Sequence, residues 1–207
     1  MRPRVLVIVG PTASGKSDLA VKLAKKLNGE VISADSRQVY KGLDHGTGKI
    51  IKKEMRGVPH HLLDVVSPEK VFSASDYKKL ALKKIEEILK RDRLPIIVGG
   101  TGFYIDALML DLPEVAPNQK LRKSLENMSL EKLSKMLGEH NVSDRKNKVR
   151  LIRAIEIVEA LGHIPPLCKS SEGQTYEFVF VGIKPRDLEK RIEKRLDKRM
   201  LGMIREV

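Results

Sequence analysis

The chain has 207 residues, of which 41% are hydrophobic, and a formal net charge of +13 from 40 basic and 27 acidic residues. The apolar content excludes a disordered protein, the single cysteine Cys168 excludes an internal disulfide, and no apolar run approaches the roughly 18 residues of a membrane span. We therefore expect a cytoplasmic, monomeric globular protein whose basic surface either attracts a polyanion or is simply lysine-rich and solvated.

Short apolar runs in the first hundred residues predict buried strands, at residues 5–9, 31–34 and 94–98. Helical spacing separates the runs. Leu19, Leu23 and Leu27 mark one helix, and Ser73 or Ser75 could cap a second one that ends near Leu89. This alternation predicts an α/β fold with a parallel sheet and helices on both of its faces.

The pattern changes at Leu112, after which Pro113 and Pro117 interrupt the chain. Helical stretches follow with no strand between them, at residues 121–128, 130–137 and 148–161. A strand at 177–183 and a final helix marked by Leu188, Ile192, Leu196 and Met200 then return to the first pattern. We therefore divide the chain into a core at 1–111, a small all-helical insertion at 112–172 and a return to the core at 173–207.

A complete phosphate-loop motif, G-x-x-x-x-G-K-[ST], follows the first predicted strand and precedes the first helix. Its residues are Gly10, Pro11, Thr12, Ala13, Ser14, Gly15, Lys16 and Ser17. In such a loop the backbone N–H groups surround a phosphate, the lysine adds charge toward the outer phosphate, and the hydroxyl of Ser17 can ligate Mg²⁺. The motif predicts a P-loop NTPase-like sheet but leaves the phosphorylated ligand open, and a chance glycine-rich turn is the alternative.

Polar residues follow two other predicted strands, Asp35-Ser36-Arg37-Gln38 after the second and Thr101 after the third. Because the carboxyl ends of parallel strands meet at one edge of a sheet, we expect Asp35 and Thr101 to lie near Lys16. Asp35 could bind Mg²⁺ through water or accept a proton, or it could be an ordinary turn residue. Thr101 could donate to a phosphate oxygen or cap the next helix.

Two basic stretches could bind an external anion. Residues 145–153 contain no acidic residue, although a solvated helix start is the alternative. In the last helix Arg191 follows Asp187 by one turn and should form an ion pair with it, whereas Arg195 has no acidic residue three or four positions away. His60 and His61 lack further ligands at metal-binding spacing, so we expect them to orient a loop by hydrogen bonds.

Together these motifs resemble the bacterial tRNA dimethylallyltransferases, also called isopentenyltransferases. The similar segments are GPTASGKS at 10–17, GEVISADSRQVYKGLDHGTGK at 29–49, GVPHHLLDVVSP at 57–68, FSASDYKKLA at 72–81, PIIVGGTGFYIDAL at 95–108, VRLIRAIEIVEALG at 149–162 and RIEKR at 191–195. They occur in the order of the family and span nearly the whole chain. Arg37 and Asn147 depart from the residues common in the family, and we expect that a further C-terminal part of the family is not included in these 207 residues.

The resemblance implies transfer of a dimethylallyl group from dimethylallyl diphosphate to N6 of adenine 37 in the anticodon loop of tRNA, after the base is flipped out of the loop. It implies Mg²⁺ near Ser17, Asp35 as general base, and Thr101 and Arg195 as contacts of the diphosphate that the phosphate loop binds. It also implies contacts with tRNA from Asp35, Ser36, Arg37, Gln38, Thr101, Arg122, Val149, Arg150, Leu151, Ile152 and Arg153.

Three other functions remain compatible with the motifs. A phosphate-loop kinase would transfer a phosphoryl group from ATP to a small acceptor. An isopentenyltransferase of free nucleotides would use AMP or ATP as the acceptor. A nucleotide-dependent RNA-binding module would bind RNA without chemistry.

Overall fold

The structure is a computed structural model that describes residues 2–169 and 175–205. The chain divides into two compact units: unit 1 consists of Met1–Asp111 and Lys169–Val207, and unit 2 consists of Leu112–Cys168. The predicted boundary between residues 172 and 173 lies outside the described residues. Within the described part of the chain, no helix has the length and apolar character that crossing a membrane requires.

Unit 1 contains a five-stranded sheet in the order β3-β2-β4-β1-β5, and its strand pairs are parallel. The strands are β1 (Arg4–Val9), β2 (Gly29–Ser33), β3 (His60–His61), β4 (Leu94–Gly99) and β5 (Glu177–Gly182). The predicted α/β class, with its parallel sheet and all four predicted strands, is confirmed. Since β4 lies between β1 and β2, the segments that follow these three strands meet at one edge of the sheet.

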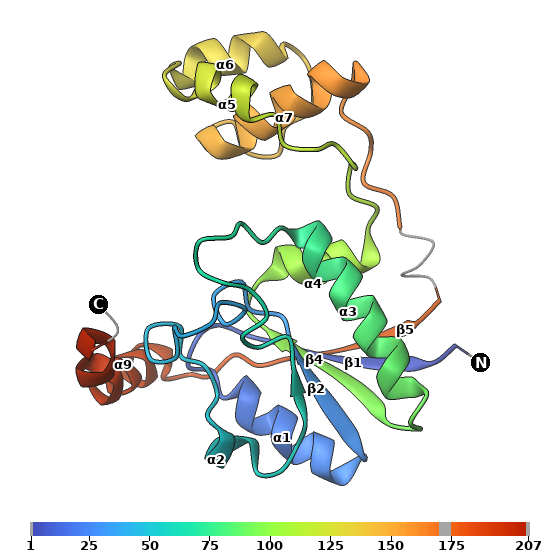
Figure 1. Cartoon of the computed structure of the whole chain (residues 1–207), viewed down its shortest axis with the longest axis vertical. Helices are drawn as coiled ribbons and strands as arrows, with labels where there is room; N and C mark the ends of the chain where they lie inside the picture. The colour runs from blue at the N-terminus through green and yellow to red at the C-terminus, as the bar shows by residue number, and fades with distance from the viewer. Residues whose placement is uncertain (1, 170–174, 206–207) are drawn as a thin grey trace. The chain divides into compact units, whose positions relative to one another are not determined.

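Helices cover both faces of this sheet, and α1 (Lys16–Lys26) and α3 (Ala74–Leu89) lie on opposite sides of it (Figure 1). On the α1 face, Ala20, Val21 and Ala24 pack against Ile8 and Ile96 of the sheet. Ser73 caps α3, as one of the two predicted alternatives requires, by accepting a hydrogen bond from the backbone N–H of Asp76. The short helices α2 (Lys52–Met55) and α4 (Gly102–Met109) complete the first part of unit 1.

A buried carboxylate on β2 links this strand to β3 and to the segment that precedes β4. Glu30, with a side chain 3% exposed, accepts hydrogen bonds from Arg91 at 2.8 and 3.2 Å and from Arg93 at 3.0 Å. Its Oε2 also lies 2.6 Å from Nε2 of His61, while Nδ1 of His60 lies 2.8 Å from the carbonyl oxygen of Val58. The histidines thus make hydrogen bonds, as expected, and they also form a short strand paired with β2, which the sequence did not indicate.

Unit 2 contains three helices, α5 (Gln119–Glu126), α6 (Leu130–Leu137) and α7 (Lys148–Leu161). The side chains of Asn118, Ser129 and Asn147 accept hydrogen bonds from backbone N–H groups in the first turns and so cap these helices. The core of the unit is apolar and consists mainly of Leu125, Leu133, Leu137, Leu151, Ile152 and Ile155. The described part of the predicted insertion is therefore all-helical.

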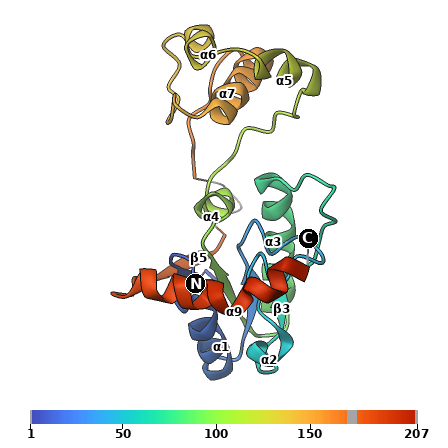
Figure 2. The ribbon, with the colours of Figure 1, turned by 90° about the vertical axis from the view of Figure 1, so that its left-hand side faces the viewer.

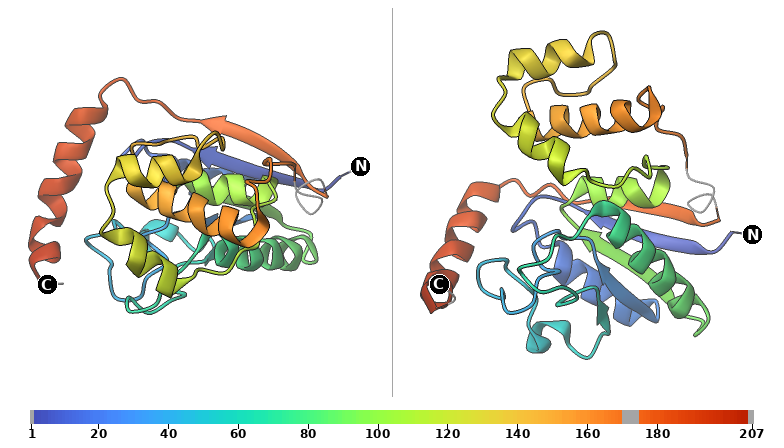
Figure 3. Two further views of the ribbon diagram at one scale, coloured as in Figure 1. Left: turned by 90° about the horizontal axis from the view of Figure 1, so that it is seen from above. Right: turned by 45° about the horizontal axis from the view of Figure 1, so that its top comes forward.

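The last helix, α9 (Leu188–Arg205), lies beyond the carboxyl ends of β1 and β5 (Figure 1, Figure 3). Its apolar positions Ile192, Leu196 and Met200 are 41%, 50% and 48% exposed, whereas Arg195 and Arg199 are half-buried. Figure 2 shows α9 in front of the sheet of unit 1. The predicted helix is confirmed, and it turns a basic side, with two arginines one turn apart, toward the rest of unit 1.

Candidate active site

The phosphate loop connects β1 to α1, as its motif requires. Gly15 precedes the helix with φ at +90°, a left-handed conformation that glycine adopts without strain, and α1 begins at Lys16. Nζ of Lys16 donates a hydrogen bond to the carbonyl oxygen of Pro11 at 3.0 Å. The loop therefore presents backbone N–H groups at the positive end of α1, and the side chain of Lys16 folds back over the loop. This arrangement suits the binding of a phosphate group.

Lys16 lies in the electrostatic field of two distant residues, Asp35 and Arg195. Burial lowers the pKa of Lys16, the nearby Asp35 carboxylate opposes this effect, and the Arg195 guanidinium adds to it. Three charged groups from the phosphate loop, the segment after β2 and the helix α9 are thus close enough to interact. The structure therefore brings together the residues that the resemblance assigns to the diphosphate and to proton transfer.

Asp35 begins a turn directly after β2. Its Oδ1 accepts a hydrogen bond from the backbone N–H of Arg37 at 2.9 Å, and its Oδ2 accepts one from the side-chain amide of Gln38 at 3.3 Å. The turn that we considered as the alternative role of Asp35 is present. The carboxylate is nevertheless half-buried beside Lys16 and has neutral hydrogen-bond donors, so the geometry leaves it able to accept a proton.

Thr101 joins the ends of β2 and β4. Its Oγ1 accepts a hydrogen bond from the backbone N–H of Ser36 at 3.1 Å and lies 3.3 Å from the hydroxyl of Ser36. Thr101 stands at the N-cap position of α4, as the helix-cap alternative requires, but its side chain makes no capping hydrogen bond there. Nearby, a Cβ on Gly99 would overlap the backbone of Ala34, so the absence of a side chain at Gly99 sets the spacing between the two strand ends.

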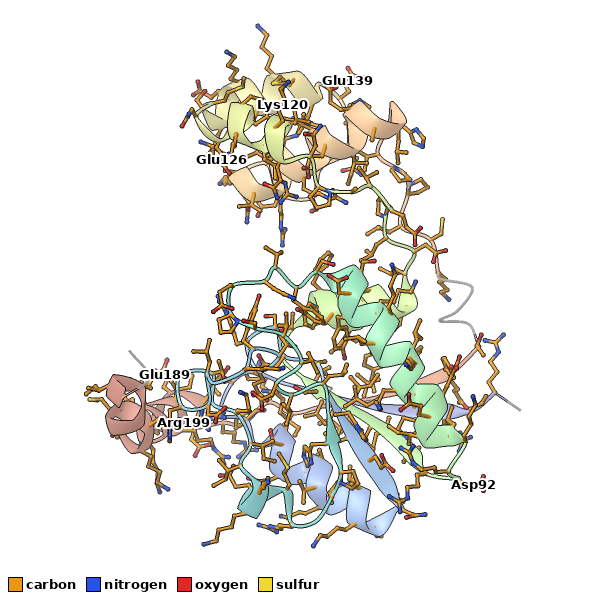
Figure 4. All side chains as sticks on the ribbon, viewed as in Figure 1. Asp92, Lys120, Glu126, Glu139, Glu189 and Arg199 are labelled. Atoms are coloured by element: carbon orange, nitrogen blue, oxygen red, sulfur yellow. The ribbon has the colours of Figure 1, made fainter. Side chains whose placement is uncertain are left out.

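Arg195 reaches the site from α9. Its Nη2 donates a hydrogen bond to the carbonyl oxygen of Gly48 at 3.1 Å, across 147 positions of sequence. Arg191 forms the predicted ion pair, with its Nε 2.7 Å from Oδ1 of Asp187. Arg199, labelled in Figure 4, belongs to the same end of unit 1, and Asp92, also labelled, lies at the opposite end. A Cβ on Gly48 would overlap the guanidinium of Arg199, so both arginines of α9 approach the same turn.

Comparison with known proteins identifies the family. The model of the family described as IPP transferase matches residues 38–207. The chain is 43% identical over 196 residues to the tRNA dimethylallyltransferase of Pediococcus pentosaceus, covering 87% of the chain and 62% of that protein. It is 44% identical over 213 residues to tRNA dimethylallyltransferase 2 of Treponema denticola, covering 97% and 71%.

The chain belongs to the tRNA dimethylallyltransferase family. Solved structures of this family have the same fold. The full-length tRNA isopentenylpyrophosphate transferase of Bacillus halodurans matches with a TM-score of 0.67 and 38% identity, over 99% of the chain and 69% of that protein. A eukaryotic dimethylallyltransferase described as acting on tRNA matches with a TM-score of 0.76 and 28% identity, over 99% and 55%. The chain thus spans 55–71% of the length of these four relatives.

The residues of unit 2 that the family resemblance assigns to tRNA differ in their surroundings. Val149 and Arg150 are exposed, and Arg150 lies 3.6 Å from Asp144. Leu151 is 0% exposed and Ile152 is 8% exposed, since both belong to the apolar core. Helical periodicity points these two side chains inward, so their burial offers no exposed side-chain surface to tRNA.

Arg122 and Arg153 share one buried carboxylate, that of Glu156. Arg122 donates two hydrogen bonds of 2.8 Å to its oxygens, and Arg153 donates one of 3.2 Å. Glu156 stands three positions beyond Arg153, just outside the basic run, and sequence analysis missed it. Arg145 of the same run donates to the carbonyl oxygens of Ser134, Gly138 and His140. Much of this stretch therefore holds unit 2 together.

Sequence analysis also missed the turn that contains Gly48. The carbonyl oxygen of Gly48 accepts hydrogen bonds from Arg195 and from the side-chain amide of Gln38 at 3.4 Å. A glycine between two polar residues is the one local sign of an unusual backbone conformation here, and Gly48 has φ at +67°. The partners of its carbonyl group depend on tertiary contacts that no local pattern indicates.

Proposed function

We propose that the protein transfers a dimethylallyl group from dimethylallyl diphosphate to N6 of adenine 37 in the anticodon loop of tRNA. The observation that carries this proposal is the meeting of Lys16, Asp35, Thr101 and Arg195 at one edge of the sheet, in a chain that belongs to this family. Relatives at 43% and 44% identity are named tRNA dimethylallyltransferases, which supports the same reaction for this protein.

The proposed chemistry is one alkyl transfer. The N6 amine attacks the first carbon of the prenyl group, the bond between this carbon and the diphosphate oxygen breaks, and diphosphate departs with the electron pair. Asp35 accepts the proton that N6 loses. Lys16 and Arg195 stabilise the negative charge that grows on the leaving diphosphate, because their positive charges already lie at the phosphate loop before the reaction.

The residues of the loop fit Mg²⁺ as the metal of this site. The Ser17 hydroxyl in the first turn of α1 would hold the ion. Its other ligands would be water and phosphate oxygens, which are ligands that Mg²⁺ prefers. When bound, Mg²⁺ would neutralise charge on the diphosphate.

One buried hydroxyl supports the assignment of the loop to a phosphorylated ligand. Ser14 is 4% exposed, and its Oγ has no hydrogen-bond partner among the described residues. A buried hydroxyl without a partner costs free energy unless a ligand or water satisfies it. We infer that Ser14 donates to a phosphate oxygen when the diphosphate is bound.

We further propose that tRNA contacts both units. In unit 1 the turn of Asp35, Ser36, Arg37 and Gln38 and the hydroxyl of Thr101 line the reacting edge of the sheet, and in unit 2 the exposed Val149 and Arg150 begin α7. Arg122 and Arg153 are one-third exposed and are held in place by Glu156. They could therefore bind a phosphate group without a further loss of side-chain freedom. The net charge of +13 favours such a polyanion.

One assay tests this function against its rivals. The protein is incubated with Mg²⁺ and labelled dimethylallyl diphosphate, and with unmodified tRNA, AMP or no acceptor. We expect label on adenine 37 of tRNA and none on AMP. Label on AMP would indicate a nucleotide isopentenyltransferase. A parallel incubation with labelled ATP in place of the prenyl donor tests for a kinase, which would transfer the labelled phosphate to a small acceptor. Binding of tRNA without any transfer would indicate an RNA-binding module.

A further inference from the structure

A buried lysine lies directly after the turn that contacts Arg195. The side chain of Lys49 is 5% exposed, and its Nζ donates hydrogen bonds to Oδ1 of Asp44 at 2.6 Å, to Oδ1 of Asp64 at 2.6 Å and to the carbonyl oxygen of Tyr40 at 2.9 Å. These three acceptors use all three donors of the ammonium group. Burying such a charge is costly without this pairing, so the contacts of Lys49 hold a defined geometry.

The two aspartates also hold the site through their backbones. The carbonyl oxygen of Asp44 accepts a hydrogen bond from the backbone N–H of Lys49 at 2.9 Å. The backbone N–H of Asp64 donates to the carbonyl oxygen of Gln38 at 3.3 Å. Asp64 has φ at +55°, an uncommon conformation that the surrounding contacts must maintain. By pairing with both carboxylates, Lys49 therefore fixes two backbone segments relative to each other.

The peptide group between Gly48 and Lys49 is held from both sides. Its N–H donates to Asp44, and its carbonyl oxygen accepts from Arg195 at 3.1 Å and from Gln38 at 3.4 Å. The same amide of Gln38 donates to Oδ2 of Asp35 at 3.3 Å. A continuous series of contacts thus runs from the ammonium group of Lys49 to Arg195 and to the carboxylate of Asp35.

We propose that Lys49 is a positioning residue of the active site, which fixes the peptide between Gly48 and Lys49 and thereby orients Arg195 toward the diphosphate and Gln38 toward Asp35. The proposal rests on the proposed function for the roles of Arg195 and Asp35. It places Lys49 behind the reacting groups, without contact to either substrate.

The charge of Lys49 is constant under the conditions of the reaction. Burial lowers its pKa, but the hydrogen bonds and charges of Asp44 and Asp64 outweigh burial and raise the pKa above its ordinary value. Lys49 therefore stays protonated at neutral pH. Its effect on Arg195 should depend on the geometry of the turn and not on a change of charge.

Binding of inorganic pyrophosphate tests the proposal without tRNA. Calorimetry compares the wild type with Lys49→Met, which keeps the length of the side chain, and with Lys49→Arg, which keeps the charge. Lys41→Met, at an exposed lysine of the same segment, controls for the lost charge. We expect Lys49→Met to weaken pyrophosphate binding about tenfold or more, as removal of groups behind a ligating side chain does. Lys49→Arg should restore part of the affinity, and Lys41→Met should resemble the wild type.

A double-mutant cycle separates positioning from a general role in folding. If Lys49 acts through Arg195, then adding Lys49→Met to Arg195→Ala should change affinity less than about twofold, because the guanidinium that Lys49 orients is already gone. The same fold loss in both backgrounds would overturn the proposal. So would a Lys49→Met protein that binds at reduced stoichiometry with wild-type affinity, since that result indicates only a smaller folded fraction.

Failure of this inference can be distinguished from failure of the proposed function. If the wild type binds pyrophosphate but labels no tRNA, the proposed transfer fails while the calorimetric comparison still decides the role of Lys49. If the wild type labels tRNA and Lys49→Met binds pyrophosphate as Lys41→Met does, the positioning role alone is wrong.

Discussion

Asp35 in unit 1 and Glu156 in unit 2 are both carboxylates with hydrogen bonds to both oxygens, but their donors differ. Asp35 accepts from a backbone N–H and a side-chain amide, which are neutral. Glu156 is 0% exposed and accepts from Arg122, from Arg153 and from the backbone N–H of Asn118 at 2.8 Å. Asp35 thus accepts hydrogen bonds from neutral groups alone, whereas Glu156 accepts most of its hydrogen bonds from guanidinium groups.

This difference in donors distinguishes Glu156, a carboxylate with a structural role, from Asp35, a carboxylate that can take part in the reaction. Burial raises the pKa of Glu156, but the hydrogen bonds of Arg122, Asn118 and Arg153 outweigh burial and lower the pKa to about 2. Such a carboxylate is a weak base and serves to hold α5 and α7 together. Asp35 instead lies near Lys16, whose hydrogen-bond partner in the loop is the carbonyl oxygen of Pro11. The surroundings of Asp35 therefore leave both Asp35 and Lys16 available to bind a substrate.

The largest expected effect is that of Asp35→Asn. The amide keeps the size of the side chain but cannot accept a proton, so we expect the single-turnover rate of prenyl transfer to fall by about 10²–10⁴-fold. Affinity for dimethylallyl diphosphate and the melting temperature should change little. A near-normal rate would show that Asp35 is only a turn residue and would remove its contrast with Glu156.

Arg195→Ala should follow in size. Because the diphosphate gains negative charge as it leaves, loss of the guanidinium should lower the single-turnover rate by about 10²–10³-fold. Arg191→Ala is the matched control, since Arg191 is paired with Asp187 on the same helix. Equal effects of the two substitutions would indicate that α9 offers only a general basic surface.

Glu156→Gln should affect stability and not chemistry. It leaves Arg122 and Arg153 beside a neutral amide, so we expect the free energy of unfolding of unit 2 to fall by about 3 kcal/mol. Hydrogen exchange of the amides of α7 in denaturant measures this loss. Glu159→Gln, at an exposed position of the same helix, should have little effect.

The pH dependence of this stability gives a second measurement on Glu156. Because the pKa of Glu156 is lowered on folding, its contribution is complete above the ordinary value of 4.5 and is lost as the pH falls through about 2. Over this pH range, the free energy of unfolding of unit 2 should therefore decrease more in the wild type than in the Glu156→Gln protein. Parallel acid curves for the two proteins would contradict the assignment.

The smallest expected effect concerns binding of tRNA. The slope of log affinity against log salt should decrease by about one unit in Arg150→Gln, because each phosphate contact releases a counterion. Arg153→Gln should change the slope less, since Arg153 is held at 3.2 Å by the buried Glu156, whereas Arg150 has only the more exposed Asp144, at 3.6 Å, as its partner. Equal changes in the slope would mean that Arg153 binds a phosphate although it is paired with Glu156. The purely structural role that we assign to Glu156, in contrast to Asp35, would then be weakened.

Much of the fold could be predicted because apolar runs and helical spacing are local. The run at 94–98 predicts β4, and the three helices of unit 2 lie within two residues of their predicted bounds. β3 could not be predicted in this way, since two histidines form no apolar run and their pairing depends on β2 and Glu30. The inward direction of Leu151, by contrast, was available from its spacing of four residues from Ile155.

The candidate site divides in the same way. The phosphate loop, Asp35 and Thr101 could be placed together because each follows a parallel strand at the same edge of the sheet. The carbonyl group of Gly48 and the anchoring of its turn by Lys49 could not, because they depend on contacts between residues far apart in sequence. Arg195 has no acidic residue three or four positions away on its helix, as predicted, and it donates instead to the backbone carbonyl oxygen of Gly48, which sequence does not reveal.

The insertion of unit 2 between two parts of unit 1 has a consequence for the order of folding. Unit 2 is continuous in sequence, from Leu112 to Cys168, so its core can close while the chain is still being synthesised. Pairing of β1 with β5 joins Arg4 to Glu177, across 173 positions, and must wait until β5 has left the ribosome. We therefore expect unit 2 to fold early and quickly, and the sheet that carries the active site to be completed last.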